Sequence, residues 1–521
     1  MKAKSLLFTT ALSLLVGASI NLMGQTTFER IIPMEGCSVE LPGPECVAAG
    51  DDGYIVNVPL GIWNTIQFGH RILKLSTDGD IINELNYNVD GGRVVCYWQI
   101  VKLPFGNNAD QNHYLAVGGL CDPHDDGVNT TLTDILFLVF NDELEVEYER
   151  IEDVSEIVEH YATWGRPRVI FDNDGNLVIA TLAKVNGGEL KRLYTHVELD
   201  KVDWLGEITN YVRESPEDVG WIWDFFPLSD GTYRQVEEIS GPGGVGYRIS
   251  SDFEAEKILE FRDIRFQREN LSIIPNLLDC GGHVLLDNST LFIPATMNGH
   301  MMTSATYGIG TMEMSTDFDT IKAVFQDFHD LDTTERIFSR HPVILRGEDL
   351  YMCYTRDMRT WHPSQAPYTI LCKYDTDLNL IWKRWYRDPE RQFCYYATDM
   401  TSTNDDGIFI VGYCCKRDNY GNMKLYLLKV DSDGLLSLPE TEVQERPYGY
   451  YPNPVKEQLL MQFSPDVQPA HVELYDLQGR LVHRQNKAFE SIDMSRLPAG
   501  TYTMHVTLED GKTYTDKVVK E

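Results

Sequence analysis

The sequence predicts an all-β protein in which a seven-bladed β-propeller is followed by a small Ig-like antiparallel β-sandwich. Two alternating patterns recur seven times within residues 26–438, and a separate set of strands follows a polar, Pro-containing segment. Hydrophobic residues make up 43% of the chain, which is enough for extensive cores. With 521 residues the chain is longer than one core usually is, so more than one domain is expected.

Residues 1–24 have the pattern of a secretory signal peptide. Lys2 and Lys4 precede an apolar run from Leu6 to Val16, and small and polar residues follow as far as Gly24. The run is shorter than a membrane-spanning helix requires. The formal net charge of −34 opposes binding to nucleic acid or to anionic membranes. We therefore expect an exported protein without a transmembrane segment.

The first recurring pattern is an apolar strand, a turn rich in Asp, Gly or Asn, and a second apolar strand. Its copies lie at residues 46–58, 99–119, 168–181, 224–236, 283–296, 342–355 and 399–414. The second pattern, a short strand with an acidic or Ser turn and often a further strand, begins near residues 72, 137, 196, 247, 312, 371 and 427. Each unit thus supplies four short strands in two hairpins, and radial repetition of such units is typical of a β-propeller. A row of separate β-sandwiches is the alternative, but each unit is too short for its own core.

The first and last segments of the repeat region predict how the ring closes. The last unit ends near residues 435–438 with a weak fourth strand, whereas "TTFERIIPM" (26–34) has apolar residues at Phe28, Ile31 and Ile32. We expect this segment to pair with the last blade as its outer strand. Residues 153–165 have helical apolar spacing instead and are expected in an inter-blade loop. The repeat resembles the roughly sixty-residue propeller repeats of large exported bacterial proteins.

A second domain is expected after residue 438. Residues 439–450 are polar, contain two prolines and have the composition of a linker. Segments 458–463, 471–482, 489–510 and 511–521 alternate apolar and polar residues and are separated by Gly-containing turns. Residues 451–521 are therefore predicted to form a small antiparallel β-sandwich.

Four motifs stand in order in this second domain: "YPNP" (451–454), "ELYDLQGRLV" (473–482), "IDMSRLPAGTY" (492–502) and "KVVKE" (517–521). The residues that carry them are Tyr451, Pro452, Asn453, Pro454, Gly479, Arg480, Pro498, Gly500, Tyr502 and Lys517. The segment resembles the type A C-terminal sorting domain of the Bacteroidetes type IX secretion system. The resemblance implies export through the periplasm to the outer-membrane surface or the medium. It also implies recognition by the outer-membrane machinery and cleavage by a sortase. An ordinary Ig-like adhesive domain is the alternative.

Aromatic, Arg and His side chains gather in the loops that should surround the propeller mouth. The candidate ligand-binding residues are Trp63, His300, Arg340, His341, Arg356, Trp361, His362 and Tyr420. Aromatic faces beside Arg and His suit a sugar or a peptide, although such residues also pack between blades. No GxSxG or HExxH motif is present, so no catalytic residue is assigned. We expect a binding protein for glycan or protein. An extracellular hydrolase or lyase at the mouth, or a structural subunit of a surface assembly, is the alternative.

No cofactor is expected, apart from a cation such as calcium that a loop could bind. The segment "CDPHDDG" (121–127) has suitable ligands, and an ordinary acidic loop is the alternative. "DNDGN" (172–176) and "DSDG" (431–434) fall at hairpin turns and are interpreted as turn chemistry. Two cysteine pairs, Cys96 with Cys121 and Cys394 with Cys414, are expected to face across hairpins, with disulfides if the Cα separations allow.

Overall fold

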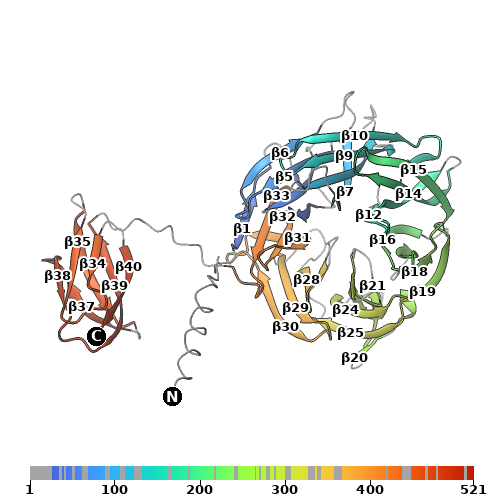
Figure 1. The fold of residues 1–521 in the computed structure, drawn as a ribbon. Coiled ribbons are helices and arrows are strands. Elements are labelled where there is room, and N and C mark those ends of the chain that lie inside the picture. Colours follow the sequence, from blue (N-terminus) through green and yellow to red (C-terminus); the bar gives the residue numbers. More distant parts are fainter. Residues whose placement is uncertain are drawn as a thin grey trace, which may run out of the picture. The chain divides into compact units, whose positions relative to one another are not determined.

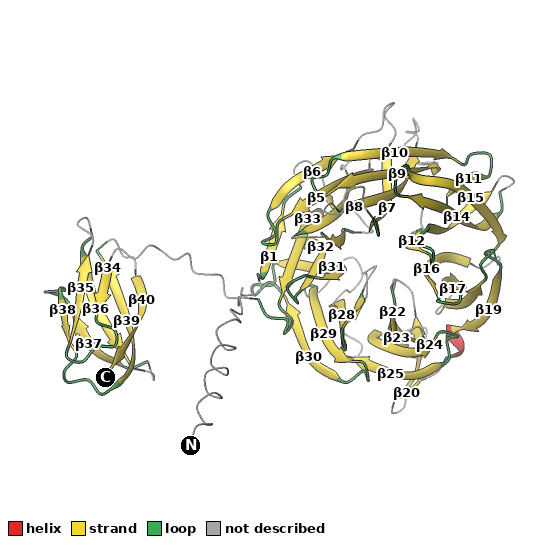
Figure 2. Ribbon diagram, viewed as in Figure 1, coloured by secondary structure: helices red, strands yellow, loops and turns green. Residues whose placement is uncertain are grey.

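The computed structural model divides into two compact units, Met1–Ser437 and Leu438–Glu521. It describes residues 26–34, 38–39, 43–49, 53–61, 68–87, 94–105, 112–121, 132–161, 167–185, 188–215, 219–239, 244–264, 266–268, 271–276, 282–286, 289–299, 307–326, 335–336, 342–356, 366–417, 419–436, 448–463, 467–476, 479–509 and 513–521. The expected signal peptide, 1–24, lies outside these residues. The described elements are strands apart from the 3₁₀ turn η1 (Phe261–Asp263), shown in red in Figure 2. Within them, no helix is long and apolar enough to cross a membrane.

The first unit is a β-propeller, which confirms the expected fold class. Its described residues form seven antiparallel sheets arranged around a central axis (Figure 1). We number them blades 1 to 7 in chain order; the count of seven blades itself stays a prediction.

The strands of blades 1 to 4 follow the chain from the centre outward. Blade 1 contains β2 (Ser38–Val39), β3 (Glu45–Ala48), β4 (Tyr54–Gly61), β5 (Phe68–Leu75) and β6 (Ile81–Asn86). Blade 2 contains β7 (Val94–Lys102), β8 (His113–Cys121), β9 (Leu132–Asn141) and β10 (Val146–Asp153). Blade 3 contains β11 (Val158–Tyr161), β12 (Arg168–Phe171), β13 (Leu177–Val185), β14 (Leu190–Asp200) and β15 (Trp204–Glu214). Blade 4 contains β16 (Val219–Pro227), β17 (Tyr233–Ile239), β18 (Gly244–Ile249) and β19 (Ala255–Glu260).

Blades 5 and 6 follow the same order, and blade 7 combines both ends of the unit. Blade 5 contains β20 (Phe266–Arg268), β21 (Leu271–Asn276), β22 (Val284–Leu286), β23 (Thr290–Gly299), β24 (Tyr307–Ser315) and β25 (Thr320–Gln326). Blade 6 contains β26 (Glu335–Arg336), β27 (Val343–Arg346), β28 (Asp349–Arg356), β29 (Tyr368–Asp375) and β30 (Leu380–Tyr386). Blade 7 contains β31 (Phe393–Ser402), β32 (Ile408–Lys416), β33 (Asn419–Val430) and β1 (Phe28–Ile32).

The expectation of four strands in every blade is wrong for blades 1, 3, 5 and 6. Blades 1, 3 and 6 have five strands and blade 5 has six. In each of these blades two short strands share one long partner; in blade 1, β2 and β3 both pair with β4. Blade 5 has one further strand, β20, which pairs with β21. In blade 3 the extra piece is β11, which pairs with β13. The helical interpretation of 153–165 is therefore wrong where the structure describes it, because Val158 pairs with Val185 in a strand.

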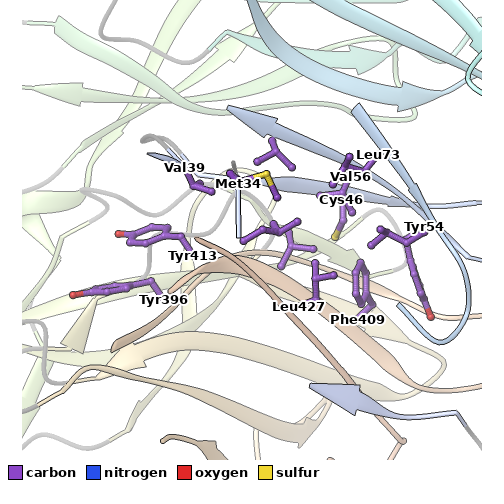
Figure 3. Packing of buried hydrophobic residues seen from close by; sticks show 14 of the residues in the cluster. Met34, Val39, Cys46, Tyr54, Val56, Leu73, Tyr396, Phe409, Tyr413 and Leu427 are labelled. Carbon is purple, nitrogen blue, oxygen red and sulfur yellow. The ribbon is translucent and has the colours of Figure 1, made fainter. Parts of the chain in front are cut away.

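The N-terminal strand closes the ring, as the sequence predicts. Strand β1 pairs with β33 from Phe28 opposite Lys429 to Ile32 opposite Leu425, so it is the outer strand of blade 7. A second seam lies at the inner end, where the Cys46 N–H donates to Asp399 Oδ2 at 2.9 Å. Apolar side chains of blades 1 and 7 interlock between the two seams (Figure 3).

A buried hydrophobic residue in the turn between the third and fourth strands packs each of several blades onto the preceding one. These wedge residues, all with φ between 58° and 64°, are Leu144, Trp204, Phe253, Phe318 and Leu378. Large side chains seldom take this conformation, so packing must offset its cost. In blades 1 and 7 the position is Gly79 or Gly434. There the preceding blade supplies the ring, because a Cβ would lie 2.5 Å from Phe28 or 2.6 Å from Trp382.

The second unit is a small β-sandwich, as expected. One sheet contains β34 (Tyr448–Tyr451), β35 (Gln458–Phe463) and β38 (Ser491–Asp493). The other contains β36 (Pro469–Tyr475), β37 (Leu481–Gln485), β39 (Gly500–Leu508) and β40 (Thr513–Lys520). Alternate residues of both sheets, such as Leu459 and Val472, form one buried core.

The expected linker, 439–450, is too long at its C-terminal end. Tyr448 begins β34 and is only 5% exposed, and its hydroxyl donates to Asp516 Oδ2 at 2.6 Å. The sequence Tyr448-Gly449-Tyr450 shows no alternation of apolar and polar residues, so the strand was not recognised. In the structure Tyr448 is buried and Gly449 is exposed. Residues 439–447 lie outside the described residues.

Neither expected cysteine pair is a pair of cross-strand partners. Cys394 lies opposite Cys415, and Tyr395 lies opposite Cys414. Cys394 and Cys415 enter one hydrophobic cluster, whereas Cys414 enters the cluster on the other face of blade 7. In blade 2, Cys96 lies opposite Gly119, and Cys121 lies opposite Val94. Consecutive residues of a strand point to opposite faces, and the sequence does not say whether Cys414 or Cys415 shares a face with Cys394.

Candidate functional site

The first and last sorting motifs lie together in the second unit. The Asn453 side chain bridges them, because its Nδ2 donates to Lys517 O at 2.9 Å and its Oδ1 accepts from Val519 N at 2.8 Å. Val455 continues the contact as a parallel bridge with Lys520. The "YPNP" segment is thereby fastened to β40, while Tyr451 stays 57% exposed. These residues present one accessible surface built from the two ends of the domain.

The two central motifs form separate turns. In the hairpin between β36 and β37, Gly479 has φ +74 and Arg480 contacts the Asp476 carboxylate at 2.7 Å. The positive φ explains the glycine at this position. At the start of β39, the Tyr502 hydroxyl donates to Pro498 O at 2.7 Å. These two motifs therefore form structural turns of the sandwich.

Most of the mouth residues proposed from sequence lie outside the described residues. This holds for Trp63, His300, Arg340, His341, Trp361 and His362, and for "CDPHDDG" after Cys121. Tyr420 belongs to β33, but its side chain is not among those described. Arg356 ends β28 opposite Glu335. The described residues contain no group of three or more His, Cys, Asp or Glu arranged to hold a metal ion.

A pocket between blades 3 and 4 is the site that sequence reasoning missed. Its volume is about 290 Å³. It is formed by the turns that follow β12, β16 and β18, together with residues of β14, β15, β16 and β17. The lining residues are Asp172, Asn173, Asp174, His196, Tyr211, Pro227, Gly231, Thr232, Tyr233, Ser251 and Phe253. These residues are spread over 82 positions of the sequence, so no local motif announces the pocket.

Asp172 organises the polar wall of this pocket. Its Oδ1 accepts from Asp174 N at 2.9 Å and Asn176 N at 2.8 Å, and its Oδ2 lies 3.0 Å from His196 Nε2. The interpretation of "DNDGN" as turn chemistry is thus confirmed. Asp174 is exposed at the pocket rim. One carboxylate is therefore used within the protein, and the other faces solvent beside the cavity.

Phe253, the wedge residue of blade 4, anchors the aromatic wall. Its ring stacks on Tyr233 at 5.5 Å and on Tyr194 at 4.9 Å, and lies tilted to Tyr211 at 4.9 Å. Burial raises the pKa of Tyr233 to about 12, and the Asp172 and Asp174 charges act in the same direction. The two nearby carboxylates therefore add to the effect of burial in disfavouring the ionised form of this tyrosine.

A buried polar network holds blades 3 and 4 together near this pocket. The Arg192 guanidinium donates to both carboxylate oxygens of Glu237, at 2.5 and 2.7 Å, and lies over the Tyr247 ring. Gln235 accepts from the Tyr194 hydroxyl at 2.9 Å. Burial alone would lower the pKa of Arg192, but the Glu237 hydrogen bonds and charge raise it above its ordinary value. The network fixes the two walls of the pocket relative to each other.

Residues 449–521 match the family model described as the secretion system C-terminal sorting domain. Similar solved structures include PorZ, a surface component of the type IX secretion system of Porphyromonas gingivalis, with 10% identity over 90% of this chain and 69% of that chain and a TM-score of 0.30. A Dyadobacter fermentans protein of unknown function has 11% identity over 63% and 93%, with a TM-score of 0.39. The Fusarium graminearum α-L-arabinofuranosidase Arb93A has 9% identity over 78% and 98%, with a TM-score of 0.39.

Similarities at this level carry no argument about activity. No curated protein matches the chain significantly in sequence. The sorting-domain match, in contrast, covers every motif that the sequence singled out in the second unit. The C-terminal unit is the sorting domain of a type IX secretion cargo, which indicates export to the cell surface or the extracellular space.

Proposed function

We propose that this protein is an exported binding protein whose propeller binds a glycan or protein ligand after the sorting domain has delivered it. The observation that carries the proposal is the pocket between blades 3 and 4. It combines aromatic rings with hydrogen-bonding groups on a rigid two-blade support. Pockets of this composition bind ligands by stacking on one wall and hydrogen bonding on the other.

The sorting domain contributes two further partners to the proposal. The type IX outer-membrane machinery recognises the surface formed by the "YPNP" segment and β40, and a sortase then cleaves before the sorting domain. The exposed Tyr451 and the accessible terminal strand support recognition there. The mass of the secreted protein tests the cleavage: loss of about one sorting domain is expected, and an intact secreted chain would contradict it.

Binding is tested with the mature full chain on glycan and peptide arrays. The matched protein carries Tyr211→Ala and Asp174→Asn, which alter one aromatic and one polar element of the pocket while the buried network stays in place. We expect the ligands retained by the natural chain to be lost by this variant, with unchanged circular dichroism. Equal retention by both proteins would move the binding site away from the pocket, and chemical turnover of a retained glycan would instead make the protein an enzyme.

A further inference from the structure

We infer that the ligand group held between blades 3 and 4 is an organic cation, namely an ammonium or guanidinium group. The inference rests on the proposed binding function and adds the chemical class of the ligand. It uses the charge of the pocket, the contacts of its aromatic rings and its size.

The charge balance of the pocket favours a cation. Two carboxylates, Asp172 and Asp174, belong to its described lining, and no Lys or Arg does. Asp172 shares a hydrogen bond with His196, whereas Asp174 is exposed at the rim and available to a ligand. An anionic group would be repelled here. A neutral donor could only hydrogen-bond to the carboxylates, whereas a cationic donor would add a direct charge attraction to the same hydrogen bonds.

The aromatic wall provides the second element of a cation site. Ring faces of Tyr attract ammonium and guanidinium groups through the ring quadrupole. The Tyr211 ring already shows this preference, because the Arg213 guanidinium lies 5.6 Å from its centroid. Arg213 Nε lies 3.0 Å from Glu254 Oε1, so its charge is balanced outside the pocket. Because Glu254 balances Arg213, the pocket carboxylates and the neighbouring tyrosine and phenylalanine rings are left to bind a second cation, supplied by the ligand.

The size of the pocket limits the ligand to a single group. A volume of about 290 Å³ lies at the lower end for small-molecule sites. It suits one amino-sugar residue or one Lys or Arg side chain of a partner protein. Both sources present the same positive group, so matched probes are needed to separate them.

The experiment measures the binding of four probes to the mature full chain by isothermal titration calorimetry. Glucosamine is compared with N-acetylglucosamine. Nα-acetyl-lysine methylamide is compared with Nα-acetyl-norleucine methylamide. In each pair only the first is cationic. We expect at least one cationic probe to bind about tenfold tighter than its neutral partner; the pair that responds identifies the source. Asp174→Asn should weaken that probe by about two- to fivefold, as expected for one exposed charge.

Asp78→Asn is the matched control, since it removes one exposed carboxylate from a turn of blade 1. It should leave binding unchanged. Equal affinity for the cationic and neutral members of both pairs would overturn the charge inference and leave the binding function standing. Lack of binding by both cationic probes would also overturn it. The array experiment decides independently whether the pocket binds anything. Tyr211→Leu provides a second variant, expected to weaken the cationic probe without altering the Asp174 carboxylate.

Discussion

At the residue scale, polar side chains often fasten one blade to the next at the inner end of the propeller. Gln99 Oε1 accepts from Val169 N at 3.1 Å, and Asp399 Oδ2 accepts from Cys46 N at 2.9 Å. The register of β7 shifts just before Gln99, and that of β31 just before Asp399. Such bulges re-aim a side chain, and here they direct a polar group at the neighbouring backbone.

Asp224 and His283 form the corresponding link between blades 4 and 5, with Nδ1 and Oδ2 2.8 Å apart. Burial alone would raise the pKa of Asp224, but the charge and hydrogen bond of His283 hold it below its ordinary value. The stability contributed by the ionised carboxylate is therefore present above the unfolded pKa of about 3.9. It is lost as pH falls through the lower folded pKa.

We expect Asp224→Asn to destabilise the propeller by about 3 kcal/mol at neutral pH, since it removes the charge of a buried pair. Denaturant unfolding measured from about pH 6 down to pH 2 should show a smaller acid loss in the variant than in the natural chain. Asp433→Asn, in an exposed turn, is the control and should follow the natural chain. An identical acid dependence in Asp224→Asn would contradict the assignment.

The register of blade 7 also predicts which thiols can be joined. Cross-strand partners have Cα atoms about 4.5–5.5 Å apart, within the range of disulfides. The hydrogen bond with Cys394, together with burial, raises the pKa of the Cys415 thiol, so oxidation of the folded protein should be slow at neutral pH.

Refolding in a glutathione redox buffer should join Cys394 to Cys415 and leave Cys414 unlinked to either. Peptide mapping without reduction is the measurement. Cys414→Ser should give the same linked peptides. A Cys394–Cys414 link, even in a minor fraction of the folded protein, would show that the two cysteines share a face and that the register is wrong.

At the element scale, the wedge residues explain why the turn between the third and fourth strands of a blade varies in sequence. Phe318 lies against Gly246 of blade 4, and Phe253 lies against Tyr194 of blade 3. Gly79 and Gly434 interrupt the series because a ring of the preceding blade, Phe28 or Trp382, occupies the same place. The sequence shows only an acidic or Ser turn followed by either Gly or a hydrophobic residue. Which blade supplies the buried ring depends on contacts between repeats.

Gly79→Ala should therefore cost more than an equivalent change at an open turn. Gly175 has a similar positive φ, but no atom lies within 4 Å of the position that a Cβ would take there. We expect Gly175→Ala to cost about 1 kcal/mol from backbone strain alone. Gly79→Ala should add about 1–3 kcal/mol, because the new methyl group collides with the Phe28 ring.

Unfolding free energies of both variants measure this difference. A double-mutant cycle with Phe28→Leu should reveal coupling of Phe28 to Gly79 and none to Gly175. Equal costs at the two glycines would mean that Phe28 does not fill the wedge position of blade 1.

At the scale of the whole molecule, the sequence predicted the class, the order of the two folds and the closure of the ring. Apolar alternation and turn residues recur at each repeat, so these features depend on local patterns. The pocket between blades 3 and 4 was not predicted, since it joins residues from three turns and four strands that meet only after folding. The mouth residues proposed from sequence remain predictions.

Removal of residues 448–521 should separate delivery from folding. The core of the second unit shares no residue with the described clusters of the propeller, so the truncated propeller should keep its melting temperature. In a host with type IX secretion it should accumulate in the periplasm, as cell fractionation can show. The control for folding effects is a full-length chain whose sorting surface is inactivated by point substitution. Normal surface delivery of the truncated protein would refute the sorting role.

Ring closure makes the stability of the propeller depend on its N-terminal strand. Removal of residues 26–34 leaves the β33 edge unpaired and takes Phe28 and Met34 from the cluster between blades 1 and 7. A loss of about 4 kcal/mol is expected from the aromatic side chain alone, with a melting temperature lower by roughly 5 °C for a unit of this size. The exposed edge should also promote association.

A chain lacking only residues 1–25 is the reference for thermal melting and light scattering. Addition of the peptide TTFERIIPM should restore part of the lost stability, because it can pair with β33 in the register of β1. A scrambled peptide of the same composition should have no effect. If the truncated chain melted like the reference and stayed monomeric, the outer strand would be dispensable. The inner seam at Asp399 and Cys46 would then suffice to hold the ring closed.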